Sequence, residues 1–202
     1  MSFHLILGSS SPSRQALLKQ WGYEFETEPA DIDEKSIRAE TAEELVQKLA
    51  LAKSEAILAR RTRFEDQKPT LLVTADQVVV HEGRILEKPK DAKEAHEFIS
   101  GYSCSPAVTV GAIVVTNCQS HRRECGLDRS EIYFRPIPDS VIQQLVEEGS
   151  VYYCAGGLQV ENPLVSKFVD HIVGTLDSVM GLSRQVLEDL IEKVISGQSL
   201  KV

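Results

Sequence analysis

A single carboxylate interrupts a strongly apolar stretch of this chain. Asp76 lies between the hydrophobic runs 71–73 and 78–80, and a buried carboxylate without a partner costs several kcal/mol. A metal ion, a cation or a position at a strand end beside a cleft must therefore compensate its charge. Asp76 is accordingly a candidate metal ligand or general base. A strand-end bulge or a salt bridge to a helix lysine are the structural alternatives.

A second candidate is the segment GSSSPSR at residues 8–14, which follows a short apolar run. Ser11 and the proline after it predict the start of a helix, and the N–H groups of a first helical turn suit a phosphate. Ser9 and Ser11 add hydroxyl donors, and Arg14 adds a guanidinium that can bind phosphate oxygens bidentately. The alternative is a plain serine cap with a surface arginine. The segment lacks the GxxxxGKS/T pattern, which argues against a P-loop NTPase.

Other charged residues are compatible with metal-assisted chemistry on a phosphate. Asp31, Asp33 and Glu34 form an acidic loop that could supply oxygen ligands to Mg²⁺, unless the loop is simply solvated. Lys53 lies among small and apolar residues of a predicted helix, so its side chain either extends to solvent or points into a cleft. Lys88 precedes a proline that holds its backbone extended, and on its own it is interpreted as a surface lysine.

Alternating strands and helices must position these residues. The chain has no linker rich in Pro, Gly and Ser and no detectable repeat, so we expect one α/β domain over residues 1–202 with a mixed sheet. The predicted strands are 3–7, 23–27, 71–80 with a polar interruption, a short one after Glu82-Gly83, 107–115, 129–135 and 165–172, and the predicted helices are 12–22, 41–57, 92–99, 139–148 and 182–195.

The overall composition excludes several classes of protein. The 202 residues include 22 Lys+Arg and 30 Asp+Glu, a formal charge of −8, without a block rich in basic residues. Binding to a nucleic-acid polymer requires a broad basic footprint, so we expect no such partner. A small phosphorylated ligand is compatible with this charge if a few cations converge. The 26% of charged and 42% of hydrophobic residues are typical of a globular protein and exclude disordered and collagen-like classes.

We expect a cytoplasmic protein that does not associate with membranes. The apolar run at the N-terminus is short and follows no basic residues, unlike a secretory signal. No apolar stretch approaches the ~20 residues that span a bilayer. The cysteines show neither a CxxC pair nor the histidine spacing of a zinc site, so we expect reduced thiols. They are Cys104, Cys118, Cys125 and Cys154.

A series of short motifs follows the chain from end to end. They are LILGSSSPSRQ at 5–15 with Leu17-Leu18, then Asp33-Glu34, Lys53, ADQVV at 75–79, EKP at 87–89, Ala155-Gly156 and DSVMGL at 177–182. In this order they resemble the Maf family, nucleoside triphosphate pyrophosphatases once linked to septum formation. The resemblance implies a Maf-like (ITPase-like) α/β fold, an extended, twisted mixed sheet flanked by helices, with an active-site cleft between two lobes.

The resemblance also implies an enzyme, a hydrolase that acts on nucleoside triphosphates. Such an enzyme cleaves the bond between the α and β phosphates and yields a nucleoside monophosphate and pyrophosphate, with Mg²⁺ or Mn²⁺ as cofactor. Carried over by position, Asp76 is the general base and, together with Glu34, a metal ligand. The groups that hold phosphate or offset its charge are Ser9, Ser11, Arg14, Lys53 and Lys88.

Two positions indicate which base the family member accepts. Gln77 and Glu161 look like the branch of the family that acts on 7-methyl-GTP. A carboxylate can accept from the N–H groups of a guanine edge, and N7-methylation makes this base cationic. Four departures weaken this assignment. Ser13 stands where that branch usually has Trp, and Gln15 replaces a frequent second Arg. The usual SGxxH has become SGYSC at residues 100–104, and Ser183 replaces the Pro of GLP.

Other functions stay open beside a 7-methyl-GTP pyrophosphatase that removes modified nucleotides. A dTTP/UTP or broader noncanonical-nucleotide pyrophosphatase shares the same chemistry. A weakly catalytic, nucleotide-binding regulator of cell division would bind nucleotide without releasing pyrophosphate. The retained Asp76, Lys53 and Lys88 favour an enzyme, because a pure binder needs no buried base. Members of the family are often dimers, so the resemblance is compatible with a homodimer.

Overall fold

The computed structural model describes residues 3–61, 63–64 and 68–197, and these form two compact units. The prediction of a single domain over residues 1–202 stays a prediction, because compactness alone does not show which parts fold on their own. Each unit is built from segments that are distant in the sequence. The first unit comprises the described residues of 1–76, 111–128 and 181–202, and the second comprises 77–110 and 129–180.

Long strands connect the two units. Strand β3 (Thr70–His81) starts in the first unit, β5 (Ala107–Asn117) returns to it, and β6 (Arg123–Phe134) leaves it again. Within the first unit, β1 (His4–Leu7) lies between β2 (Glu26–Thr27) and β3 and is parallel to both. The side chains of β1 and of the first half of β3 are nearly all buried, as expected for a parallel strand with both faces covered.

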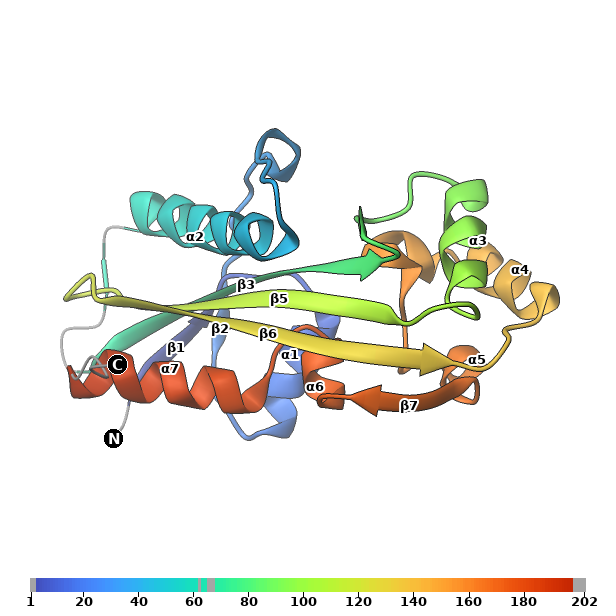
Figure 1. Ribbon diagram of the computed structural model, residues 1–202. Helices are drawn as coiled ribbons and strands as arrows, with labels where there is room; N and C mark the ends of the chain where they lie inside the picture. Colours follow the sequence, from blue (N-terminus) through green and yellow to red (C-terminus); the bar gives the residue numbers. More distant parts are fainter. Residues whose placement is uncertain (1–2, 62, 65–67, 198–202) are drawn as a thin grey trace. The chain divides into compact units, whose positions relative to one another are not determined.

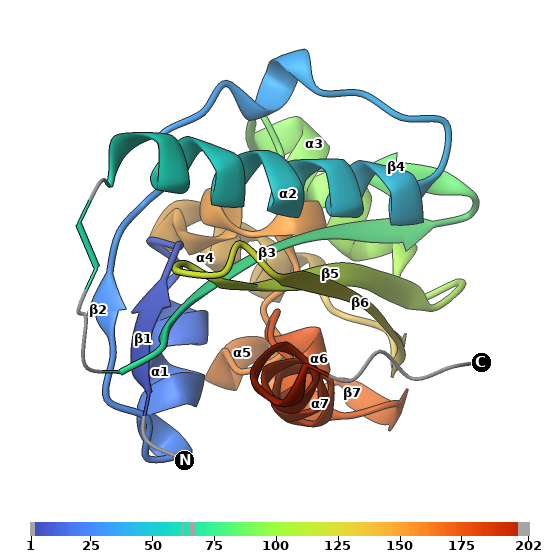
Figure 2. The same ribbon diagram turned by 90° about the vertical axis from the view of Figure 1, so that its left-hand side faces the viewer.

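Three helices cover this part of the sheet. Helix α2 (Ala42–Arg60) lies on one face, while α1 (Pro12–Gln20) and α7 (Arg184–Ser196) lie on the other (Figure 2). A buried hydrogen bond from Oγ1 of Thr74 to the carbonyl of Ala50, 2.8 Å long, fixes α2 against β3. This contact places α2 directly above the strand that carries Asp76.

The second unit completes the sheet. Strand β4 (Arg84–Leu86) pairs with β3, and β7 (Val169–Val173) pairs with β6, in both cases antiparallel. The sheet has seven strands in the order β2-β1-β3-β5-β6-β7, with β4 off this path. Figure 1 shows the long strands β3, β5 and β6 of this sheet. This architecture confirms the predicted α/β fold with a mixed sheet. The helical elements are α3 (Ala92–Gly101), α4 (Asp139–Glu148), α5 (Pro163–Ser166), α6 (Leu176–Val179) and the 3-10 turns η2 (Ser150–Tyr153) and η3 (Ala155–Gly157).

Local capping signals predicted the helix boundaries well. Ser11 caps α1 and accepts from the backbone N–H of Arg14 at 3.4 Å. Thr41 caps α2 in the same way, with the N–H of Glu44 at 3.2 Å from its Oγ1. Helix α4 ends at Gly149, whose φ of 75° lies in the left-handed region that glycine adopts without strain. These interactions are local, so the sequence contains them directly.

Three strand predictions were wrong in extent. The strand predicted at 23–27 is reduced to Glu26–Thr27. The strand predicted at 165–172 begins only at Val169, because Asn162 caps the short helix α5, with Oδ1 of Asn162 accepting from the N–H of Leu164. Strand β6 begins at Arg123, before the predicted 129, since its first half is polar and largely outside the core.

The second unit has its own hydrophobic core. Tyr102 is almost fully buried there, and its hydroxyl donates to the carbonyl of Gly156 at 2.6 Å. Its ring stacks against Phe134, with centroids 5.9 Å apart. The core includes Val79, Leu86, Phe98, Ile99, Ile132, Ile142, Leu145 and Val151.

Among the described residues, no helix combines the length and the apolar composition needed to cross a membrane.

Candidate active site

Asp76 is buried within β3, with 9% of its surface exposed. Strand β3 runs from Thr70 to His81 and does not end at this residue. The Oδ1 atom of Asp76 lies 2.5 Å from Nζ of Lys53 in α2. A salt bridge to a helix lysine, one of the alternatives that the sequence left open, therefore compensates the buried charge.

Lys53 points inward because of its position on α2. Ala50, Lys53 and Ile57 follow the helical spacing of the buried face, and the side chain of Lys53 is only 11% exposed. Its Nζ also lies 2.8 Å from Oε1 of Glu34. One ammonium group thus joins two carboxylates from distant parts of the chain, which excludes the solvent-extended orientation considered for this lysine.

The acidic loop forms a capped turn. Glu34 opens the 3-10 turn η1 (Glu34–Ser36), and Oδ1 of Asp33 accepts from the backbone N–H of Lys35 at 3.2 Å. The cap orients Asp33 toward its own backbone, whereas the side chain of Glu34 reaches Lys53. The carboxylate of Glu34 therefore shares its charged partner with Asp76.

The chain turns away from the sheet at the predicted phosphate segment. The N–H of Gly8 donates to the carbonyl of Val73 at 2.7 Å, and a Cβ atom at Gly8 would lie 2.5 Å from Cγ2 of Thr74, so a larger residue would displace its neighbours. Oγ of Ser9 accepts from the N–H of Ser11 at 3.2 Å. A pocket of about 450 Å³ opens beside this turn and is lined by Gly8, Ser9, Ser10, Pro29, Ala30, Asp31, Ile32, Glu34 and Lys53.

Arg14 is not a surface arginine. It is 9% exposed, and its Nε and Nη1 atoms donate to the carbonyls of Gly181 and Ala75, both at 2.9 Å. Nη1 also lies 3.4 Å from Oγ of Ser9. Burial lowers the pKa of the Arg14 guanidinium from its ordinary value, while the negative charge of Asp76 acts in the opposite direction.

The first unit therefore gathers most of the predicted site residues. Ser9, Arg14 and the Lys53–Asp76 pair are connected by the contacts above, and Glu34 shares the ammonium of Lys53. Ser11 serves as the helix cap, and Ser13 is half-buried on α1. The roles that the resemblance gives these residues stay predictions, but their proximity is a property of the fold.

The remaining predicted residues lie in the second unit, where Gln77 is firmly held. Its Nε2 donates to the carbonyl of Ser178 at 2.9 Å, and the hydroxyls of Ser178 and Ser130 are 2.8 Å apart. Ser178 was not singled out from the sequence as a partner of Gln77. The only signal was its place in the motif at 177–182.

Lys88 and Glu161 are both exposed. Burial raises the pKa of the half-buried Cys154 thiol, a hydrogen bond with Gln159 lowers it, and the charges of Glu161 and Lys88 raise and lower it respectively. Gly156 donates its N–H to the carbonyl of Glu87 at 2.9 Å. The charges of both predicted residues thus act on the same thiol of the second unit.

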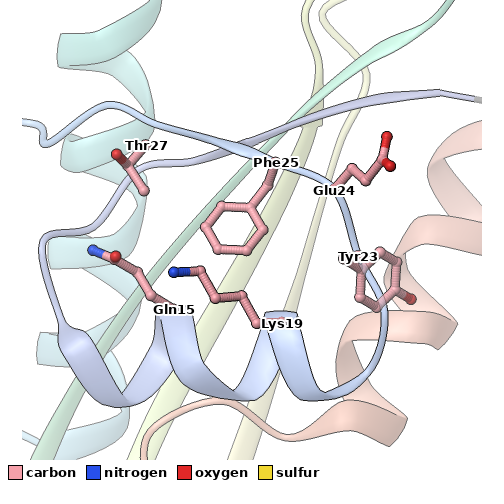
Figure 3. A pocket seen from close by; sticks show the side chains of 6 residues that line it. All are labelled: Gln15, Lys19, Tyr23, Glu24, Phe25 and Thr27. Carbon is pink, nitrogen blue, oxygen red and sulfur yellow. The ribbon is translucent and has the colours of Figure 1, made fainter.

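Another pocket on the first unit involves none of the residues predicted to bind phosphate or metal or to act in catalysis. It has a volume of about 490 Å³ and lies between α1 and residues 23–27 (Figure 3). In Figure 3 the side chain of Lys19 extends from α1 toward the ring of Phe25. Its lining residues are Gln15, Lys19, Tyr23, Glu24, Phe25 and Thr27.

The carboxylates beside Lys53 provide only part of the ligands that a hard divalent cation requires. Glu34 and Asp76 direct carboxylate oxygens to the same ammonium, and oxygen is the ligand that Mg²⁺ prefers. Across residues 3–61, 63–64 and 68–197, no three His, Cys, Asp or Glu side chains form a group that could hold a metal ion. Mg²⁺ is commonly held by one or two carboxylates together with substrate phosphates, so this pair fits a cation that shares its ligands with a substrate.

Comparison with known proteins adds an independent finding. The family model described as "Maf-like protein" matches residues 4–194. A 7-methyl-GTP pyrophosphatase of Dictyostelium discoideum is 36% identical over 192 residues, 94% of this chain and 96% of that protein. A dTTP/UTP pyrophosphatase of Syntrophus aciditrophicus is 35% identical over 92% of this chain and 88% of its own. A nucleoside triphosphate pyrophosphatase of a Synechococcus species is 31% identical, covering 94% and 93%.

Proposed function

The chain belongs to the Maf family, and on this premise we propose that it hydrolyses nucleoside triphosphates between the α and β phosphates. The products are a nucleoside monophosphate and pyrophosphate. The observation that carries the proposal is the contact of one buried ammonium, that of Lys53, with Asp76 and Glu34 beside the pocket at the start of α1. This arrangement supplies a base, a cation and hydrogen-bond donors, the parts that phosphoryl transfer requires.

Asp76 acts as the general base in this proposal. The oxygen of a water molecule bonds to the α-phosphorus in line with the leaving group, and its proton passes to the Asp76 carboxylate. The bond to the bridging oxygen breaks, and its electron pair leaves with pyrophosphate. Lys53 is proposed to offset negative charge on the phosphates, and the hydroxyl of Ser9, which lines the pocket together with Lys53, is proposed to donate to a phosphate oxygen.

We further propose Mg²⁺ or Mn²⁺ as cofactor, with Glu34 and Asp76 as its protein ligands. Two carboxylates that already share one cation, the Lys53 ammonium, can share another. When bound, the metal ion would offset charge that develops on the phosphates. Lys88 is proposed to add a further positive charge at the triphosphate.

The favoured substrate in this proposal is 7-methyl-GTP. The relatives include both 7-methyl-GTP and dTTP/UTP pyrophosphatases at similar identity, so overall identity does not select the base. Gln77 and Glu161 carry the assignment: the amide of Gln77 is held by its bond to Ser178, and Glu161 offers an acceptor for guanine N–H groups. A dTTP/UTP or broader noncanonical-nucleotide specificity is the alternative. A homodimer and a cytoplasmic location remain predictions.

A panel of nucleotides tests the proposal. Purified protein is incubated with 7-methyl-GTP, GTP, dTTP, UTP and ITP, each with Mg²⁺, with Mn²⁺ or with EDTA, and pyrophosphate and orthophosphate are assayed separately. We expect pyrophosphate release, fastest with 7-methyl-GTP and lost in EDTA. Release of orthophosphate would contradict cleavage between the α and β phosphates, and a faster reaction with dTTP or UTP would reject the substrate assignment.

A further inference from the structure

The hydrogen bonding of β3 changes immediately before Asp76. Pairing with β1 ends at Leu7 and Val73, and the N–H of Gly8 forms the last contact along this edge, with the carbonyl of Val73. Carbonyls two residues apart point to the same side of a strand. The carbonyl of Ala75 therefore faces the place where β1 would have continued, had the chain not turned into α1.

Arg14 fills this place. Its Nη1 donates to the Ala75 carbonyl at 2.9 Å, and its Nε donates to the carbonyl of Gly181 at the same distance. The Ala75 carbonyl belongs to the peptide group that leads into Asp76. The guanidinium thus replaces a missing strand partner at the peptide next to the buried carboxylate, and it ties that peptide to the turn before α7.

We propose that Arg14 is a positioning residue that fixes the backbone of β3 at Asp76, and that this, rather than binding phosphate, is its contribution to the reaction. The inference rests on the proposed function for the role of Asp76. It differs from the role that the resemblance assigns to Arg14, because two of its donors are directed to backbone carbonyls in the structure.

The shape of the guanidinium explains why an arginine is suited to this task. Its donors lie in one plane at fixed angles, so one side chain can bind two carbonyls in different segments. A lysine has a single nitrogen and retains the charge without this fork. Arg14→Lys therefore separates geometry from charge, and Arg14→Gln removes both.

Steady-state kinetics and nucleotide binding distinguish positioning from phosphate binding. For Arg14→Lys and Arg14→Gln we expect kcat to fall on the order of a hundredfold, with KM and the Kd for nucleotide within about threefold of the wild type. Arg84→Gln is the matched control, since this exposed arginine pairs with the exposed Glu97 in the second unit. A KM or Kd that rises tenfold with kcat unchanged, or no change in either constant, would overturn the proposal.

A double variant decides the case in which both constants change. If Arg14 acts through Asp76, adding Arg14→Gln to Asp76→Asn costs no further activity, because the group being positioned is already lost. If the double variant instead loses activity by the product of the two single effects, Arg14 has a role independent of Asp76, and the proposal is overturned.

Hydrogen–deuterium exchange provides a readout that needs no turnover. In Arg14→Gln we expect the backbone around residue 76 to exchange at least about tenfold faster than in the wild type, and in Arg84→Gln at the wild-type rate. Unchanged exchange would reject the anchoring contact even in an active enzyme. Absence of pyrophosphate release from the wild type would instead reject the proposed function, while the exchange experiment would still test the anchoring.

Discussion

The candidate residues of the two units differ in how deeply they are buried. In the first unit, Arg14, Lys53 and Asp76 are each about nine-tenths buried and paired with one another or with backbone carbonyls. In the second unit, Lys88 and Glu161 are exposed. Buried charges need partners at short distances, so their geometry is fixed before any ligand arrives. Exposed charges remain hydrated, so their substitution costs the fold less.

On the proposed function, the two units contribute differently to the reaction. The first unit holds the proposed base, the Lys53 cation and the candidate metal ligands. The second holds Gln77 and Glu161, the candidate residues for recognising the base, together with Lys88, the candidate cation for the triphosphate. Substitutions of the buried residues of the first unit should therefore lower kcat or stability, and substitutions of Gln77 or Glu161 should change the ratio of kcat/KM between substrates.

The largest effect is expected for Asp76→Asn. Removal of a general base should lower kcat on the order of a thousandfold, while the nucleotide Kd measured in EDTA stays within a few-fold, because Lys53 and Ser9 remain. Turnover and nucleotide binding by calorimetry measure the two quantities. Asp189→Asn, an exposed residue of α7, is the control for the same chemical change. Wild-type activity in Asp76→Asn would remove this residue from the proposed mechanism.

Lys53→Met should act on stability as well as on turnover. It leaves the carboxylates of Glu34 and Asp76 without their shared cation, and removal of one partner of a buried pair costs about 3–5 kcal/mol in the free energy of unfolding. Urea denaturation measures this loss. Lys48→Met, an exposed lysine of the same helix, should show little loss.

Divalent cations provide a second test of the contacts that Lys53 makes with Glu34 and Asp76. In Lys53→Met, Mg²⁺ or Mn²⁺ can replace the missing positive charge, so either ion should raise the midpoint of thermal unfolding more than it does in the wild type. Equal shifts in the wild type, Lys48→Met and Lys53→Met would show that Glu34 and Asp76 do not form a cation site.

A smaller effect is expected for Glu161→Gln. Loss of a charged acceptor for the methylated guanine should lower the ratio of kcat/KM for 7-methyl-GTP to that for GTP about tenfold, with the free energy of unfolding unchanged. Kinetics with the two substrates measure the ratio. If the ratio stays the same while kcat falls, the proposed division between the two units is wrong.

The smallest effect concerns the alkylation of Cys154, whose pKa is affected by the charges of Glu161 and Lys88. Burial raises the pKa of this thiol, so its alkylation should be slow at neutral pH and accelerate above the pH range of an ordinary thiol, where the thiolate forms. Bound nucleotide should slow the reaction further. Mass spectrometry after timed alkylation measures both effects, with the exposed Cys104 as internal reference. Equal rates with and without nucleotide would place the ligand elsewhere.

The sequence predicted best those features that depend on neighbouring residues. The caps at Ser11 and Thr41 and the end of α4 at Gly149 each rest on contacts within one turn. The extent of β2 and the helix at 163–166 were mispredicted. For the latter, Asn162 caps the helix and a proline follows it, a local signal that the prediction of a strand did not use.

For the site residues too, features that depend on the neighbouring sequence could be predicted, and features that depend on contacts between distant segments could not. The apolar surroundings of Asp76 required a compensating charge, and the structure supplies it from Lys53. The inward orientation of Arg14 could not be predicted, because it depends on β1 ending opposite Val73 and leaving the Ala75 carbonyl open. That contact arises from the register of two strands, which no local pattern encodes.

Hydrolysis in water enriched in ¹⁸O tests the central claim most directly. The nucleotide on which the protein is most active is converted completely, and the products are analysed by mass spectrometry. If water attacks the α-phosphorus, one ¹⁸O atom enters the nucleoside monophosphate and the pyrophosphate carries none. Label in the pyrophosphate, or in orthophosphate, would contradict the account.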